Sequence, residues 1–171
     1  MFENLQIEDN LPDIGEINFK SIQKSYLKLM LIKTSVIFIA LMAGLTFGLM
    51  PKLNEKIPDY SYIFYLALIL IFALIFLFVV LGFHKRKYAI RQKDITFKHG
   101  VLVHSMTTIP FSRIQHIEID EGVFERILKL ASLSIYTAGD NGRDLKINGL
   151  NKKEAQKIKE LITNFVKDES E

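Results

Sequence analysis

Two long runs without charge constrain this chain more than any other feature. Tyr60–Phe83 has 24 consecutive uncharged positions, and Thr34–Met50 has another 17. Uncharged apolar runs of about 18 residues or more are candidate membrane spans. The longer run would form a helix of about 36 Å, enough to cross a hydrocarbon core of about 30 Å. Three tyrosines gather at its start, as at a membrane interface. The runs predict a membrane protein, and a helix buried in a large soluble core is the disfavoured alternative.

The first predicted span, Leu31–Met50, is weaker than the second because it contains Lys33. A lysine near a helix end can extend its ammonium group to the lipid headgroups. Pro51 would end the helix. A cleaved signal peptide is the alternative, but such a segment needs a short basic start and a small-residue cleavage site. Gly48–Pro51 is a poor cleavage site, and acidic residues precede the run.

The basic residues predict which side of the membrane each end occupies. The loop Pro51–Asp59 is short, so the two spans should form an antiparallel hairpin. Lys and Arg concentrate in cytoplasmic segments near span ends. We therefore expect a multi-pass protein of the cell membrane with both termini in the cytoplasm. The flanking bases are Lys20, Lys24, Lys28 and Lys33 before the spans and Lys85, Arg86, Lys87, Arg91 and Lys93 after them, against Lys52 and Lys56 in the loop.

The chain divides into three predicted parts. Residues 1–19 form an acidic tail with five acids and no base. Residues 20–83 hold a juxtamembrane helix and the two spans, at about 31–50 and 60–83, and residues 84–171 form a cytoplasmic domain. Lysines at 20, 24 and 28 would share one helical face, and Phe19, Ile22, Tyr26 and Met30 another. This segment is either an interfacial amphipathic turn or a plain extension of the first span.

The third part has the pattern of short strands followed by a helix. Apolar residues alternate with period two between Tyr88 and Ile119, with turn-like breaks at 92–94 and 98–100. One or two helical turns at 123–130, a strand at 132–137, an Asn141-Gly142 hairpin turn and a strand at 143–148 closed by Gly149 follow. Asn151 and Glu154 resemble a capping box for a final amphipathic helix. The pattern predicts an α+β, mainly β barrel or sandwich whose C-terminal helix covers an open edge.

Three segments carry a family resemblance: Thr108–Ile117, Ile135–Gly139 and Leu145–Leu150. Together with the two preceding spans, they resemble the YdbS-like bacterial membrane proteins that carry a pleckstrin-homology-like (PH-like) domain, over about residues 20–167. The resemblance implies a two-helix transmembrane hairpin followed by a cytoplasmic PH-like barrel with a C-terminal helix. It also implies a partner in the membrane, such as a larger protein with several PH-like domains, and a link to envelope stress or antimicrobial resistance. It implies no enzymatic activity.

The residues themselves favour no catalytic chemistry. The chain has no cysteine, which excludes disulfides and thiolate metal sites. Its four histidines lack metal-site spacing, and Glu118 and Asp120 are expected on a solvated strand face. No phosphate-binding glycine loop or catalytic motif is present. The two apolar runs contain no charged residue or histidine for a transport path, and bases interleaved with acids disfavour nucleic acid. We therefore expect no enzyme, no cofactor and no metal.

Two groups of residues are candidates for binding. Arg113 and Gln115 are the candidate partner-binding pair, and a bulge or turn is expected beside them because strict alternation would place them on the face of Ile117. The structural alternative is that Arg113 pairs with a nearby acid and holds the sheet together. The basic collar, Lys85-Arg86-Lys87, is the candidate lipid-headgroup contact. The predicted function is a membrane-anchored PH-like binding module, a subunit or scaffold of a membrane complex. The alternative is a lipid-headgroup-binding protein of the inner leaflet.

Overall fold

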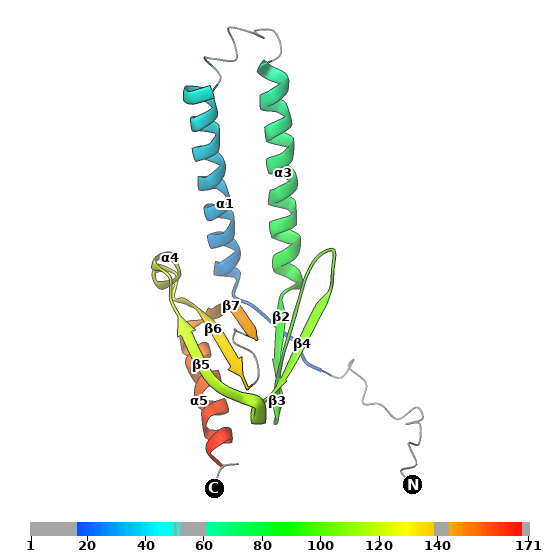
Figure 1. Ribbon diagram of the computed structural model, residues 1–171, viewed down its shortest axis with the longest axis vertical. Helices are drawn as coiled ribbons and strands as arrows, with labels where there is room; N and C mark the ends of the chain where they lie inside the picture. Colours follow the sequence, from blue (N-terminus) through cyan, green and yellow to red (C-terminus); the bar gives the residue numbers. More distant parts are fainter. Residues whose placement is uncertain (1–16, 50, 52–60, 139–143, 169–171) are drawn as a thin grey trace, which may run out of the picture.

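Two long helices stand on one side of a small α+β domain (Figure 1). The computed structural model describes residues 17–49, 51, 61–138 and 144–168. Helix α1 spans Lys24–Gly44 and continues as a π-helical turn, η2, over Leu45–Leu49. Helix α3 spans Ser61–Lys85. Both predicted apolar runs are thus helical wherever the structure describes them. Both helices are long and apolar enough to cross a membrane, with little of their surface buried in the molecule.

The two helices contact each other along their apolar faces. The rings of Phe38 in α1 and Phe72 in α3 stack with their centroids 4.0 Å apart. Near the far end, the Tyr65 hydroxyl donates a hydrogen bond to Thr46 Oγ1 at 3.3 Å. The helices are antiparallel, as the predicted hairpin requires (Figure 1). Residues 52–59 of the predicted loop lie outside the described residues.

The domain consists of two antiparallel sheets and two further helices. The first sheet has the order β1-β2-β3-β4, and the second has the order β5-β6-β7. A 3₁₀ turn, η4 (Phe111–Arg113), carries the chain from the first sheet to the second. The strands are β1 Lys20–Ser21, β2 Lys87–Ile90, β3 Asp94–His99, β4 Ser105–Pro110, β5 Ile114–Asp120, β6 Leu130–Thr137 and β7 Leu145–Asn151; the helices are α4 Val123–Ile127 and α5 Lys152–Asp168.

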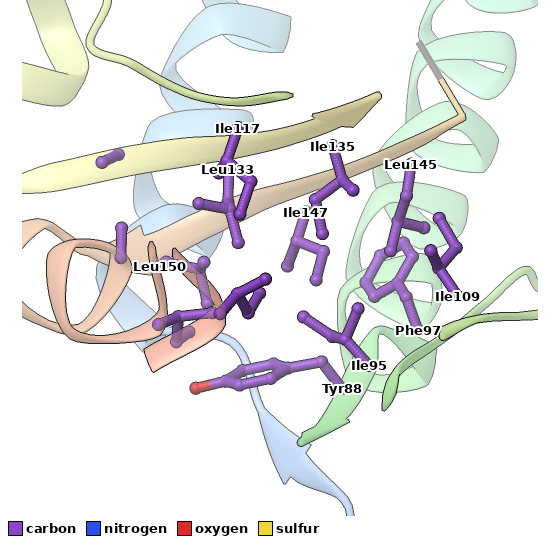
Figure 2. Close-up of a cluster of buried hydrophobic side chains, with 14 of the residues drawn as sticks. Tyr88, Ile95, Phe97, Ile109, Ile117, Leu133, Ile135, Leu145, Ile147 and Leu150 are labelled. Atoms are coloured by element: carbon purple, nitrogen blue, oxygen red, sulfur yellow. The ribbon is translucent and has the colours of Figure 1, made fainter. Parts of the chain in front are cut away.

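The hydrophobic core lies between the two sheets and the apolar face of α5 (Figure 2). Alternate residues of β3 (Ile95, Phe97) and of the first part of β7 (Leu145, Ile147) lie in the core, as predicted from the period-two pattern. The alternation ends after Asn148, because Gly149 and Leu150 are both buried. Helix α5 contributes residues at helical spacing and packs against the second sheet and η4, where the rings of Phe111 and Phe165 lie 5.3 Å apart. The core includes Tyr88, Ile95, Phe97, Ile109, Ile117, Leu133, Ile135, Leu145, Ile147, Leu150, Ala155, Ile158 and Ile162.

The segment before α1 corrects one sequence prediction. Lys20–Ser21 is a strand, paired with Tyr88 and Lys87 of β2, and not the start of a helix. Ile22 is buried in the core, and the Gln23 N–H donates to the Gly149 carbonyl at 2.9 Å. The helical interpretation of these residues is wrong because the edge of β2 offers backbone hydrogen bonds and the core offers a site for Ile22. Helix α1 begins only at Lys24.

The end of β7 and the start of α5 differ from prediction in detail. Gly149 does not close the strand, which continues to Asn151 past a register shift opposite Ala131 and Leu133. Gly149 takes a φ of +79° within this irregular stretch. Asn151 caps α5 as predicted, because its Oδ1 accepts a hydrogen bond from the Lys153 N–H at 3.0 Å. The Asn141-Gly142 turn lies outside the described residues.

Candidate functional site

The predicted partner-binding pair lies where the chain enters the second sheet. Arg113 is the last residue of η4, and the pairing of β5 with β6 shifts register between Ile114 and His116. This confirms the expected turn and bulge. Ile114 and Ile117 are buried, whereas Arg113 and Gln115 are exposed. The irregularity therefore lets the strand bury two isoleucines three positions apart and leave both polar side chains at the surface.

A groove of about 270 Å³ runs between β5 and α5, but Arg113 and Gln115 do not both line it. Gln115 lines the groove, but Arg113 does not. The sequence interpretation missed His116, whose only signal was its place beside the expected bulge. The Arg113 carbonyl accepts a hydrogen bond from the Ala138 N–H at 3.2 Å. The other groove-lining residues are Ile114, His116 and Ile117 from β5 and Lys159, Ile162, Thr163 and Val166 from α5.

The structural role predicted for Arg113 is not found in the described part of the chain. None of the acidic residues that the structure describes forms an ion pair with Arg113. The side chain is exposed at the surface beside the entrance to β5. Its guanidinium can donate several hydrogen bonds in a planar array.

The outer face of the second sheet carries a bonded polar network. His116 Nε2 lies 3.1 Å from Glu118 Oε1, and the Tyr136 hydroxyl donates to Glu118 Oε2 at 2.8 Å. Asp120 accepts from the Ser134 hydroxyl at 3.1 Å and faces the Lys146 ammonium at 3.7 Å. The two carboxylates predicted as a solvated face are therefore engaged in cross-strand contacts, which stabilise the sheet. Within the described ranges, no cluster of three or more potential metal ligands occurs.

The basic collar separates into one packed residue and two exposed ones. Arg86 is half-buried, and its Nη1 lies 3.5 Å from the Tyr26 hydroxyl and 3.8 Å from Met30 Sδ of α1. Lys85 ends α3 and Lys87 begins β2, and both are exposed. Arg86 therefore links the domain to α1, and only the two lysines are free to contact a surface.

Arg86 also borders a polar cavity that sequence analysis did not predict. The cavity has a volume of about 280 Å³ and lies between β7 and the β3–β4 hairpin. Its polar lining includes more cationic than acidic groups, with a histidine that stacks on Phe97. These side chains come from distant parts of the sequence, so no local motif marks them. They are Arg86, His99, Thr107, Asp144, Lys146 and Asn148.

A charged contact fixes the N-terminal strand to the domain. The Lys20 ammonium bonds the Glu154 carboxylate at the start of α5. Burial alone would raise the pKa of Glu154, but Lys20, with smaller contributions from Tyr88 and Gln23, lowers that pKa below its usual value. Burial also raises the pKa of Tyr88 far above its ordinary value, and the Glu154 charge raises it further. Within the described residues, the buried Tyr88 hydroxyl has no partner at hydrogen-bond geometry.

Two antiparallel sheets joined at a corner and packed against a C-terminal helix define a protein with a PH-like domain. The family model of the bacterial PH domain matches residues 26–166, from the first turn of α1 to the last turn of α5, and the chain belongs to this family. A solved structure, a DUF1696 family protein with a pleckstrin-homology domain from Shewanella loihica PV-4, is 20% identical with a TM-score of 0.38, covering 47% of this chain and 70% of that chain. No curated protein matches the chain.

Proposed function

We propose that this protein is a membrane-anchored binding module whose PH-like domain recruits a membrane protein partner at the groove between β5 and α5. The observation that carries the proposal is the edge of β5 beside that groove, which pairs with no strand that the structure describes. β5 is the outer strand of its sheet, and Gln115 and His116 are exposed along it. An open strand edge next to a partly apolar groove can accept an extended segment by strand addition. PH-like domains are in general binding modules.

The anchor and its topology form the first part of the proposal. Helices α1 and α3 cross the cell membrane, and both termini lie in the cytoplasm with the domain. The antiparallel helix pair and the bases flanking it support this arrangement. A reporter that is active only outside the cytoplasm, fused after Glu171, should be inactive. A cysteine introduced at Asn54 should be labelled by a membrane-impermeant reagent from outside, and the opposite pattern would reverse the topology.

The partner is proposed as a larger membrane protein with several PH-like domains, in a complex that serves envelope stress or antimicrobial resistance. Affinity purification in mild detergent tests this part. The wild-type chain should retain a stoichiometric membrane protein, whereas the double variant Arg113→Ala with Gln115→Ala should lose it and remain folded by circular dichroism. Both side chains are exposed, so their removal leaves the core intact. The matched control changes Lys157 and Asn164 to alanine and should retain the partner, because both are exposed on α5 and neither lines the groove.

The alternative function is binding of lipid headgroups at the inner leaflet. The cationic lining of the cavity beside Arg86 supports it, together with exposed Lys85 and Lys87. Bases near an anionic surface each contribute about 1 kcal/mol. The informative variant changes Lys85, Lys87 and Lys146 to alanine and spares Arg86, which packs against Tyr26. If this variant loses function while the Arg113 and Gln115 variant keeps its partner, lipid binding replaces partner recruitment.

A further inference from the structure

Two apolar patches of the domain are exposed on either side of the helix pair. The first is the β3–β4 loop, where Leu102 and Val103 are 82% and 80% exposed. The second is the short helix α4, where Val123, Phe124 and Ile127 are 76%, 58% and 72% exposed. We call these patches the loop wedge and the helix wedge. Large apolar side chains rarely form a patch on a surface exposed to water unless that surface contacts a protein or a membrane.

Each wedge contacts one of the two long helices. Val101 of the β3–β4 loop packs against α3 at Gly82, where a Cβ would lie 3.5 Å from the Val101 Cγ2 atom. Glu125 of α4 faces Lys33 of α1, with 3.9 Å between Oε1 and Nζ. Figure 1 shows α4 and the tip of the β3–β4 hairpin on opposite sides of the pair, both reaching the level where the helices leave the domain. The wedges therefore extend the apolar surface of the helices sideways.

The charges around the wedges favour an anionic lipid surface. Lys98, His99 and His104 flank the loop wedge, and all three are exposed. Beside the helix wedge, Arg126 and Lys129 are also exposed. The nearby acids are already matched, because Glu125 faces Lys33 and Glu121 pairs with Lys152 at 2.7 Å. Apolar side chains bordered by bases are the composition of segments that lie in a membrane interface.

We propose that the loop wedge and the helix wedge insert into the boundary between headgroups and acyl chains of the bilayer that α1 and α3 cross. This inference rests on the proposed membrane anchor. It adds that the domain itself contacts the membrane surface and is not attached to the membrane by α1 and α3 alone. Two insertions on opposite sides of the helix pair fix the tilt of the domain. They hold the groove between β5 and α5 at a set orientation to the inner leaflet, where it meets only partners bound to the same membrane.

The absence of cysteine from the chain makes a direct test possible. Single variants Leu102→Cys and Phe124→Cys of the full chain are labelled with an environment-sensitive fluorophore and reconstituted into vesicles of phosphatidylcholine and phosphatidylglycerol. Leu70→Cys, at an exposed position within α3, reports insertion of the anchor. Ser112→Cys, exposed in η4, reports a water-facing site of the domain. Each label is challenged with lipid-borne quenchers at shallow and deep positions and with aqueous iodide.

We expect labels at 102 and 124 to shift to the blue and to be quenched several-fold more by the shallow lipid quencher than the label at 112. The label at 70 should respond to the deep quencher. If 70 is quenched while 102 and 124 behave like 112, the wedges are in water and this inference is overturned, although the anchor stands. If 70 is also accessible to iodide, the anchor itself fails. If 102 and 124 are protected from iodide but untouched by lipid quenchers, a second copy or a protein covers them, which also overturns it.

Discussion

Replacing Gly149 by alanine should destabilise the junction between the domain and α1. Gly149 lies within β7 with a φ of +79°, a conformation that L-residues adopt at a cost of about 1–2 kcal/mol. A Cβ at this position would lie 2.4 Å from Cγ of Tyr26, in the first turn of α1. The Tyr26 side chain packs against the backbone of Gly149. Beside it, the Gly149 carbonyl accepts a hydrogen bond from the Gln23 N–H at 2.9 Å. The new Cβ would also lie 2.7 Å from the Cβ of Tyr26, so rotating the ring alone does not remove the clash and the backbone of α1 has to shift.

The expected loss combines two separable parts. The backbone conformation contributes about 1–2 kcal/mol, and forcing a methyl group into a packed contact contributes about 1–3 kcal/mol more. The sum is about 2–5 kcal/mol. Gly122→Ala is the matched control, because Gly122 has an ordinary φ of −69° and its Cβ would meet only the flexible Glu125 side chain, at 3.1 Å. The control should cost less than about 1 kcal/mol.

Chemical denaturation of the full chain in mild detergent, followed by circular dichroism, measures these losses. A double-mutant cycle with Tyr26→Gly separates the two parts, since that variant removes the ring and Cβ atoms that Gly149→Ala would strike. In the Tyr26→Gly background, the loss on adding Gly149→Ala should fall to the backbone part of about 1–2 kcal/mol. A loss no larger than that of Gly122→Ala would refute the strain argument. An undiminished loss in the Tyr26→Gly background would refute the clash.

Three further changes test the core and its charges. Glu154→Gln should lower the free energy of unfolding at neutral pH. Because the pKa of Glu154 is lower in the folded state, its carboxylate stabilises the fold above about pH 4 and loses this effect on acidification. The unfolding curves of variant and wild type should therefore converge in acid. Tyr88→Phe should change the free energy of unfolding little at pH 7. Above about pH 10 the wild type should lose stability, because the pKa of Tyr88 is raised in the folded state and its ionisation favours the unfolded chain, and the variant should lose less. Phe111→Ala should cost about 3–5 kcal/mol in denaturation, since that fully buried ring packs against Phe165; a loss under 1 kcal/mol would contradict its place in the core.

The helices and most strands could be predicted from the sequence because local patterns specify them. Uncharged runs indicate α1 and α3, and period-two alternation indicates the strands from β2 to β5. The segment Lys20–Gln23 was misassigned because its periodicity suits a helix. Its structure depends on β2, which is distant in sequence and offers an open edge. Tertiary pairing of this kind overrides local propensity.

The candidate site could be predicted only in part, for the same reason. Exposure at Arg113 and Gln115 follows from the expected bulge, which a break in alternation reveals. The groove next to Gln115 depends on where α5 packs, and spacing along β5 carries no information about that. Glu118 is expected in solvent from the sequence, but its carboxylate contacts His116 on the same strand and Tyr136 on the neighbouring strand β6. Register, which decides such cross-strand contacts, is not encoded in one strand alone.

The pairing of β1 with β2 joins segments that the entire helix pair separates along the chain. Closing so long a loop from an unfolded chain costs conformational entropy that grows with the logarithm of its length. The antiparallel helices bring the two ends together before any strand pairs, so we expect the helix pair to form first and the first sheet to be completed on it. A fragment that begins at residue 84 lacks both β1 and Ile22, which leaves β2 as an open edge and a gap in the core. Joining residue 27 to residue 83 by a linker would keep β1 and Ile22 together with Phe83 of the core and with Tyr26 and Leu27, which pack against it. Purifying this variant without detergent would test whether the domain folds without lipid.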